Sequence, residues 1–159
     1  MASQWVMTPA DAEIYRKYAD DLVRFASGLV GPSGAEDVVA NAILRAISAD
    51  QWTRVSNRRA YLYRSVLNEA ISQHRATVRR LNREIRSHSR TTTSDDGSSV
   101  DPDVLAALRL LSERQRAVIH LTYWEDLPVA DIASLLDLSI RTVERELSSA
   151  RRRLEALLS

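Results

Sequence analysis

Apolar positions in the first half of the chain recur at the three- and four-residue spacing of amphipathic helices, and capping residues mark where each helix begins. Thr8-Pro9 supplies an N-cap and a proline at the first helical position, and Gly31-Pro32 ends that helix. Ser33-Gly-Ala-Glu36 has the spacing of a capping box and predicts a second helix, and a third begins near Asn57. The apolar stripe of the first predicted helix is Ile14, Tyr15, Tyr18, Leu22, Phe25, Ala26 and Leu29.

The second half of the chain predicts a further set of helices. Asp101-Pro102 repeats the pattern of cap and proline, and Ser112-Glu-Arg-Gln115 is a second capping box. A short helix over 129–136 and a longer one over 140–157 are separated by the tight turn Asp137-Leu-Ser139, whose serine is a good N-cap. Two helices joined in this way have the layout of a helix-turn-helix, in which the second helix enters the major groove of DNA.

The longer of these two helices has an apolar face and a polar face. Its apolar positions, from Ile140 to Leu157, alternate three and four residues apart and predict one buried stripe. The opposite face carries hydrogen-bonding side chains that suit base edges and phosphates. The predicted DNA-reading residues are Arg141, Thr142, Arg145, Ser148, Ser149 and Arg152. The alternative is an ordinary amphipathic helix whose polar face contacts only water.

Between the two sets of helices, residues 87–100 contain a single large apolar side chain, Val100. Such a stretch cannot offset its ordering entropy by burial, so we expect a flexible linker. The chain is therefore predicted to be all-α, with two small helical domains. The first has three helices in residues 8–86, and the second has four helices, including the helix-turn-helix, in residues 101–159.

Positive charge is concentrated in the middle of the chain, although the formal net charge is only +1. Residues 54–90 carry ten arginines against two acidic residues, whereas the segments on either side are net acidic. This distribution suggests that one face of the protein meets a polyanion. The alternative is that the arginines merely solvate a long helix.

Composition argues against several classes of function. Without cysteine, the chain has no disulfide, thiolate metal site or thiol nucleophile. His74, His88 and His120 are not spaced as metal ligands, and no glycine-rich phosphate loop occurs, so we expect no enzyme activity, no metal and no cofactor. The chain has no apolar run long enough to span a membrane and no signal-peptide layout at its start. We therefore expect a soluble, cytoplasmic protein without a membrane partner.

Two parts of the chain resemble one protein family. Residues 111–145, from Leu-Ser-Glu-Arg-Gln to Arg-Thr-Val-Glu-Arg, closely resemble region 4 of bacterial sigma factors, in particular the extracytoplasmic function group. Tyr15–Leu29, Ala35–Val39, Leu44-Arg-Ala46 and Ala60–Asn68 resemble region 2 of the same family. The resemblance implies a sigma factor that binds core RNA polymerase, directs it to specific promoter DNA and supports transcription initiation. It also implies an anti-sigma factor as a regulatory partner.

The resemblance further implies roles for individual residues. The start of the second helix matches the part that binds the clamp helices of the largest polymerase subunit, although an acid such as Asp37 also suits the helix dipole. The basic third helix matches the segment that captures the −10 element, and the recognition helix should read the −35 element. Trp52, Tyr61 and Tyr63 could stack on an unpaired base or lie in the core, and the core is the preferred interpretation for both tyrosines. The implied contacts are Glu36, Asp37 and Asn41 with polymerase, and Trp52, Asn68, Arg75, Arg79 and Arg80 with −10 DNA.

Some residues depart from the pattern of this family. Asp137 stands where the family usually has glycine, and aspartate tolerates a left-handed backbone better than most residues. Glu144-Arg-Glu146 replaces the common Lys-Ser-Arg, and Leu67 and Ser72 replace the usual arginine and aspartate of the third helix. Two other interpretations stay open: a stand-alone helix-turn-helix regulator that binds duplex DNA without polymerase, and a helical adaptor that binds only protein.

Overall fold

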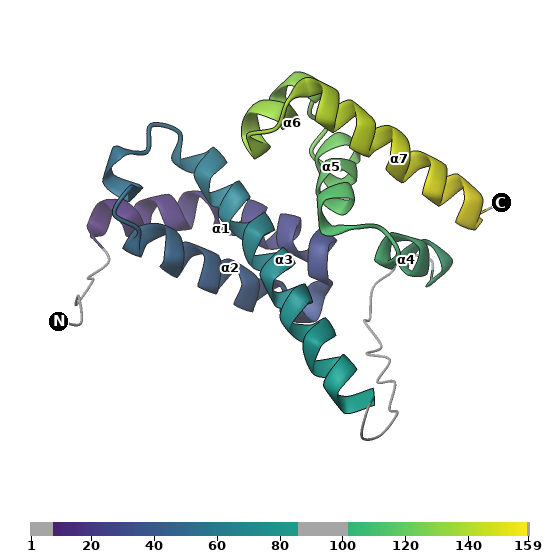
Figure 1. Cartoon of the computed structure of the whole chain (residues 1–159). Coiled ribbons are helices and arrows are strands. Elements are labelled where there is room, and N and C mark those ends of the chain that lie inside the picture. Colours follow the sequence, from purple (N-terminus) through teal and green to yellow (C-terminus); the bar gives the residue numbers. More distant parts are fainter. Residues whose placement is uncertain (1–7, 86–101, 159) are drawn as a thin grey trace.

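The described part of the chain folds into helices joined by short connections (Figure 1). The structure is a computed structural model that describes residues 8–85, here called the first module, and 102–158, the second module. The predicted linker 87–100, Arg86 and Asp101 lie outside the described residues. The elements are α1 (Pro9–Val30), α2 (Pro32–Ser48), the 3₁₀ turn η1 (Trp52–Arg54), α3 (Arg58–Ile85), α4 (Pro102–Arg109), α5 (Glu113–Tyr123), α6 (Val129–Leu136) and α7 (Ile140–Leu158). No strand occurs within the two described ranges, and the predicted all-α class is confirmed.

The first two helices are separated by a single residue, Gly31. Its φ of 90° lies in the left-handed region that favours glycine, and α2 begins directly after it. The predicted capping box at Ser33 and Glu36 is therefore wrong, because both residues already lie inside α2 and no side chain caps its start. The predicted cap of α1 does form, since Thr8 Oγ1 accepts a hydrogen bond from the Asp11 N–H at 3.1 Å.

The helix-turn-helix forms as predicted between α6 and α7. Asp137 ends α6 with φ 55° and ψ 46°, the left-handed conformation expected at this turn. Ser139 then caps α7, because its Oγ accepts a hydrogen bond from the Thr142 N–H at 3.0 Å. The predicted capping box of Ser112 and Gln115 likewise begins α5. Local signals in the sequence thus set where α5 and α7 start.

The buried stripe of α7 is shorter than predicted. Val143, Leu147 and Ala150 are buried, whereas Ile140 and Leu157 are 51% and 46% exposed. α7 packs against α4, α5 and α6, and with 19 residues it is longer than each of these three helices. The apolar residues at its two ends, Ile140 and Leu157, are therefore only partly covered.

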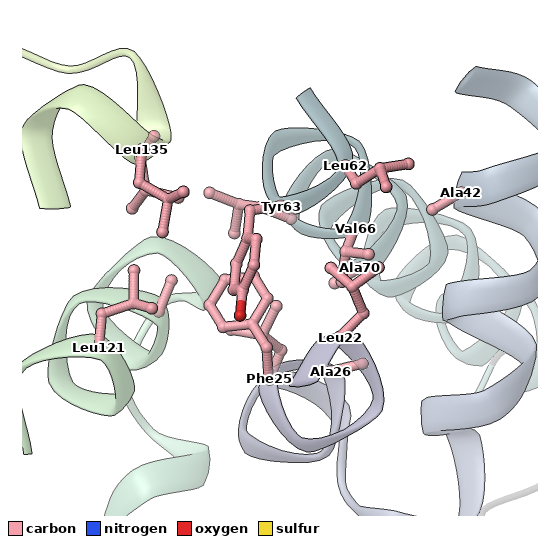
Figure 2. Close-up of a cluster of buried hydrophobic side chains, with 14 of the residues drawn as sticks. Leu22, Phe25, Ala26, Ala42, Leu62, Tyr63, Val66, Ala70, Leu121 and Leu135 are labelled. Carbon is pink, nitrogen blue, oxygen red and sulfur yellow. The ribbon is translucent and has the colours of Figure 1, made fainter. Parts of the chain in front are cut away.

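The two modules pack against each other through a shared apolar core, a contact that helical periodicity does not predict. Phe25 of α1 and Tyr63 of α3 have ring centroids 4.9 Å apart. Figure 2 shows these rings on the side that faces Leu121 of α5 and Leu135 of α6. His120 of α5 meets Phe25 edge-on, with ring centroids 5.7 Å apart. All five side chains are buried, so the predicted domains form one continuous core.

A close approach between α1 and α5 accompanies this core. A Cβ atom at Gly28 would lie 2.9 Å from His120 Nδ1, so the absence of a side chain lets the ring rest on the α1 backbone. An ion pair also crosses between the modules, with Arg64 Nη1 3.5 Å from Asp137 Oδ2. Because the Asp137 side chain is largely exposed, this pair adds little stability. Burial of apolar surface is what holds the modules together.

Candidate nucleic-acid interface

The outer face of α7 carries a line of cationic and hydroxyl side chains. Arg141, Arg145, Ser148 and Arg152 are exposed and follow one another four, three and four residues apart. This spacing places them along one face of the helix. Since α7 begins at Ile140, Arg141 lies in its first turn, the end that a recognition helix directs at base edges. The structure therefore brings four of the six predicted DNA-reading residues together.

The other two predicted residues are engaged elsewhere. Ser149 is half-buried, and its Oγ accepts a hydrogen bond from Gln115 Nε2 of α5 at 3.2 Å. Thr142 is also half-buried, and its Oγ1 lies 2.8 Å from Ser139 Oγ at the cap of α7. Ser149 therefore faces α5 of its own module, and Thr142 belongs to the turn that positions α7.

Two further arginines of α7 are held by neighbouring elements of the second module. Arg151 Nε donates a hydrogen bond to the Tyr123 hydroxyl at 2.7 Å. Arg153 Nη1 donates to the Leu110 carbonyl oxygen at 3.3 Å. These contacts fasten the C-terminal half of α7 to α5 and to the residues after α4. Arg152 lies between these two arginines and lines a groove together with Ser148 and Arg151.

The end of α3 forms a strongly basic surface on the first module. Arg75, Arg79, Arg80 and Arg83 are all exposed. Within the described residues, Arg75, Arg79 and Arg80 form no ion pair. Figure 1 shows the last turns of α3 extending beyond α1 and α2. The predicted cationic contacts therefore lie together on a projecting helix.

The exposed residue Asn68 borders a small cavity between α2 and α3. The cavity has a volume of about 190 Å³ and is lined by Ala42, Arg45, Ala46, Tyr61, Ser65, Asn68 and Glu69. Glu69 is buried, with Oε2 3.1 Å from Arg45 Nη1 and Oε1 accepting a hydrogen bond from Gln73 Nε2 at 3.2 Å. Amide and carboxylate groups of this kind can read the edge of a base. Glu69 was not predicted from the sequence, although a rare acid inside the basic block was a usable signal.

Trp52 belongs to the core and not to a DNA-facing surface. Its side chain is 3% exposed, and its Nε1 donates a hydrogen bond to Asp11 Oδ1 at 2.9 Å. That bond is the main reason why the pKa of the Asp11 carboxyl lies below its ordinary value of 3.8. The Arg58 guanidinium covers the ring at 4.9 Å from the centroid. The core alternative for Trp52 is thus the one seen in this structure, and stacking on a base stays a prediction that requires the ring to leave the core.

The outer side of α2 presents the predicted polymerase contacts. Glu36, Asp37 and Asn41 are exposed, and Leu44 is exposed beside them. Asp37, Asn41 and Leu44 are four and three residues apart and share one line along the helix. No acid lies in the first turn of α2. The helix-dipole explanation of Asp37 therefore loses its geometric basis, because that effect fades within the first turn.

Exposed helix faces are thus the functional surfaces that the structure offers. Among the described residues, no group of three or more His, Cys, Asp or Glu side chains is arranged to hold a metal ion. None of the described helices combines the length and the apolar character that a membrane span requires.

Two family models match the chain. Residues 14–91 match Sigma-70 region 2, and residues 103–154 match Sigma-70, region 4. The first match contains α2 and α3 with their acidic and basic surfaces, and the second contains the helix-turn-helix. The surfaces described above on α2, α3 and α7 therefore all fall within matched regions.

Similar proteins point to the same family. The chain is 30% identical over 147 residues to an RNA polymerase sigma-E factor of Streptomyces antibioticus, with 89% of this chain and 81% of the relative covered. A sigma-E factor of Streptomyces coelicolor is 30% identical over 149 residues, with 89% and 82% covered. The solved sigma factor RpoE, in complex with the anti-sigma factor NepR from Bartonella quintana, matches with a TM-score of 0.69 and 26% identity over 95% of this chain and 98% of that chain. The chain belongs to the sigma-70 family, as an extracytoplasmic function sigma factor that directs RNA polymerase to promoters for transcription initiation.

Proposed function

We propose that α7 reads the −35 element of the promoter from the major groove. The single observation that carries this proposal is the line of Arg141, Arg145, Ser148 and Arg152 along the free face of a capped recognition helix. Arginine pairs bidentately with guanine, and serine hydroxyls bond to bases or phosphates. Glu144 is exposed next to this line, where it would repel phosphates but accept a hydrogen bond from a cytosine amine.

In the same proposal, α3 binds the −10 element. Asn68 is exposed at the cavity between α2 and α3 and offers an amide to the edge of an unpaired base, whereas Glu69 is buried and held by Arg45 and Gln73. Arg75, Arg79 and Arg80 neutralise backbone phosphates beyond it. Stacking of Trp52 on an unpaired base would require its ring to leave the core, because it is buried in this structure. The first and second modules thus take the roles predicted for residues 8–86 and 101–159.

The third proposed surface is the outer side of α2, which attaches the protein to core polymerase. Glu36, Asp37 and Asn41 are exposed there and supply negative charge and an amide. Leu44 adds apolar surface on the same line. A surface of this composition complements a basic, partly apolar partner helix. The family resemblance identifies that partner as the clamp helices of the largest polymerase subunit.

Binding both promoter elements at once requires the two modules to separate. The −35 and −10 elements are named for their positions along the promoter, which are about 25 base pairs apart. That separation corresponds to about 85 Å of B-form DNA. A compact body of 159 residues has a radius of gyration of about 15 Å. The surfaces of α3 and α7 cannot span that length while Phe25, Tyr63 and Leu121 share one core. The closed arrangement is therefore the form that does not engage a complete promoter.

The proposal includes an anti-sigma factor as the partner that maintains the closed form. The solved relative that aligns with 95% of this chain is a sigma factor bound to an anti-sigma factor. A partner that contacts both modules would stabilise the closed form by mass action and withhold it from polymerase. The protein works in the cytoplasm, where polymerase and promoters are, and carries no catalytic step of its own.

Runoff transcription on a promoter library tests this function. Core polymerase with the protein should initiate at promoters that core polymerase alone does not use. Asp37→Arg should abolish the complex with polymerase while the helix content measured by circular dichroism stays unchanged. If the wild-type protein bound polymerase but programmed no initiation on any member of the library, the proposed function would be refuted.

A further inference from the structure

One side of α3 carries a seam that continues beyond the rest of the molecule. The positions of this seam recur alternately four and three residues apart, and all but the histidine are apolar. They are Leu67, Ile71, His74, Val78, Leu81 and Ile85. This spacing is the pattern by which one helix packs lengthwise against another.

The seam begins inside the contact between the two modules. Leu67 is buried, and Ile71 packs against the shared core. His74 follows, with its Nδ1 3.3 Å from Glu113 Oε1 of α5. The first half of the seam is therefore already a surface on which other helices pack.

The second half of the seam has no cover among the described residues. Val78, Leu81 and Ile85 are 39%, 42% and 68% exposed, and we call these three side chains the free seam. They lie on the last turns of α3, which project from the body of the protein in Figure 1. Adjoining large aliphatic side chains at the surface mark an interaction site more often than scattered ones do. Continuity with a packed interface indicates that the missing cover is another helix.

The charge beside the free seam selects the kind of helix. Arg75, Arg79 and Arg83 are exposed and four residues apart, so they form a row along its border. A second copy of this chain would bring another row of arginines against the first, and like charges in register oppose association. DNA would neutralise the row but would leave the apolar side chains uncovered. An acidic amphipathic helix satisfies both features.

We propose that the free seam docks an acidic amphipathic helix of a partner protein, with apolar residues at three- and four-residue spacing and carboxylates beside them. The carboxylates pair with Arg75 and Arg79, which also face phosphates in the proposed −10 contact. Docking therefore excludes −10 DNA from the end of α3. The exclusion rests on the proposed function, whereas the docking itself does not.

Binding of a defined peptide to the full chain tests the docking. The probe is a labelled synthetic helix of three heptads with leucine at the seam positions and glutamate beside them, and its control carries lysine in place of glutamate. Fluorescence anisotropy should detect binding of the acidic peptide and none of the lysine peptide. Leu81→Glu should weaken that binding at least about tenfold, as expected when a buried leucine contact is lost. Leu157→Glu, at a leucine of similar exposure on α7, should leave it unchanged.

Four outcomes would overturn the docking proposal. Equal binding of the acidic peptide by wild type and Leu81→Glu would locate it elsewhere, and absence of binding would remove the site. A concentration-dependent dimer that Leu81→Glu abolishes would make a second copy the occupant. Binding that appears only after residues 87–100 are replaced by Gly-Ser repeats would make the chain's own segment the occupant. Unfolding of Leu81→Glu is checked by circular dichroism, with Leu81→Gln as the milder variant.

The exclusion has its own readout. A single-stranded −10 oligonucleotide should lose affinity for the protein in the presence of saturating acidic peptide, and the lysine peptide should have no effect. A protein that binds the peptide through Leu81 yet supports no transcription would retain the docking site and refute the proposed function instead. Simultaneous binding of peptide and oligonucleotide would refute the exclusion.

Discussion

The outer face of α7 and the end of α3 are both rich in arginine, but their support differs. Behind the exposed side of α7, Val143, Leu147 and Ala150 are buried, and Arg151 and Arg153 are held by hydrogen bonds. Among the described residues, nothing packs in this way against the last turns of α3, and their arginines and apolar side chains are exposed alike. A supported helix holds side chains in the geometry that base reading needs, whereas an unsupported one supplies mainly charge. The same residue type can therefore serve specificity in one place and attraction in the other.

The largest difference between the two surfaces is expected in the free energy of unfolding, when one leucine of each helix is replaced by alanine. Leu147→Ala should cost about 2–5 kcal/mol in the free energy of unfolding, because it leaves a cavity behind the recognition helix. Leu81→Ala should change that free energy by less than about 0.5 kcal/mol, because the side chain is exposed. Urea denaturation measures both, and equal losses would contradict the difference in support.

Base reading by α7 predicts a position-specific defect. Arg145→Ala should cost about 1–3 kcal/mol of binding free energy, at one base position of the −35 element only. Affinities of the polymerase complex for a library randomised at −35 measure this effect. Ser149→Ala serves as the control and should leave the preferences unchanged, because Ser149 faces Gln115. A uniform loss on all sequences would make Arg145 a phosphate contact.

The core that joins the two modules should weaken in mild acid. Burial lowers the pKa of His120 below its ordinary value of 6.5, and Glu125, with Oε1 3.7 Å from Nε2, offsets only part of that effect. Above pH 6.5 the ring is neutral in both the folded and the unfolded chain. Below it, the unfolded chain takes up the proton first, so the stability is lost as the pH falls toward the lowered pKa of the folded state. The free energy of unfolding, compared at pH 7.5 and 5.5, should show this decline, and His120→Leu should reduce it.

Charge supplied by α3 predicts a defect without sequence preference. Arg79→Ala should weaken −10 DNA binding to a similar extent on every sequence and reduce the slope of log K against log salt by about 1. Binding of the polymerase complex to several promoters over a salt series measures the slope. An unchanged slope, or loss at a single base position, would assign Arg79 a role like that of Arg145.

The smallest effect is expected at the turn before α7, where the second module contacts the first half of α3. Asp137→Gly relieves a left-handed aspartate but removes the exposed pair with Arg64. Relief of the left-handed backbone is the larger of these two effects. Thermal unfolding should therefore show a gain of at most about 1 kcal/mol in the free energy of unfolding. A clear loss would mean that the pair matters more than its exposure suggests, and Arg64→Ala would then show the same loss.

The sequence predicted those parts of the fold that depend on neighbouring residues. The turn at Asp137 and the cap at Ser139 are local signals, and both hold in the structure. The role of Trp52 was not accessible in this way, because its hydrogen-bond partner Asp11 lies 41 residues away. Phe25 was correctly placed on an inward face, but helical spacing does not say that this face also meets the second module.

The candidate site, like the fold, could be predicted from the sequence only where it depends on neighbouring residues. The helical spacing of residues 140–157 predicted the exposed line that contains Arg145 and Arg152. Ser149 lies at the border of that face, and the border is decided by a side chain of another helix, Gln115. Glu69 lies seven residues after Leu62 on the buried side of α3, but helical spacing does not identify its ion-pair partner, Arg45 of α2.

The contact between Gly28 and His120 gives the closed form little tolerance. The imidazole sits where a single methyl group on α1 would collide with it, so the two helices cannot slide past each other by small steps while the ring stays seated. For this reason we expect the proposed separation of the two modules to be an abrupt event. A wedge as small as alanine at position 28 would tilt the balance toward release without altering any side chain that faces promoter or polymerase.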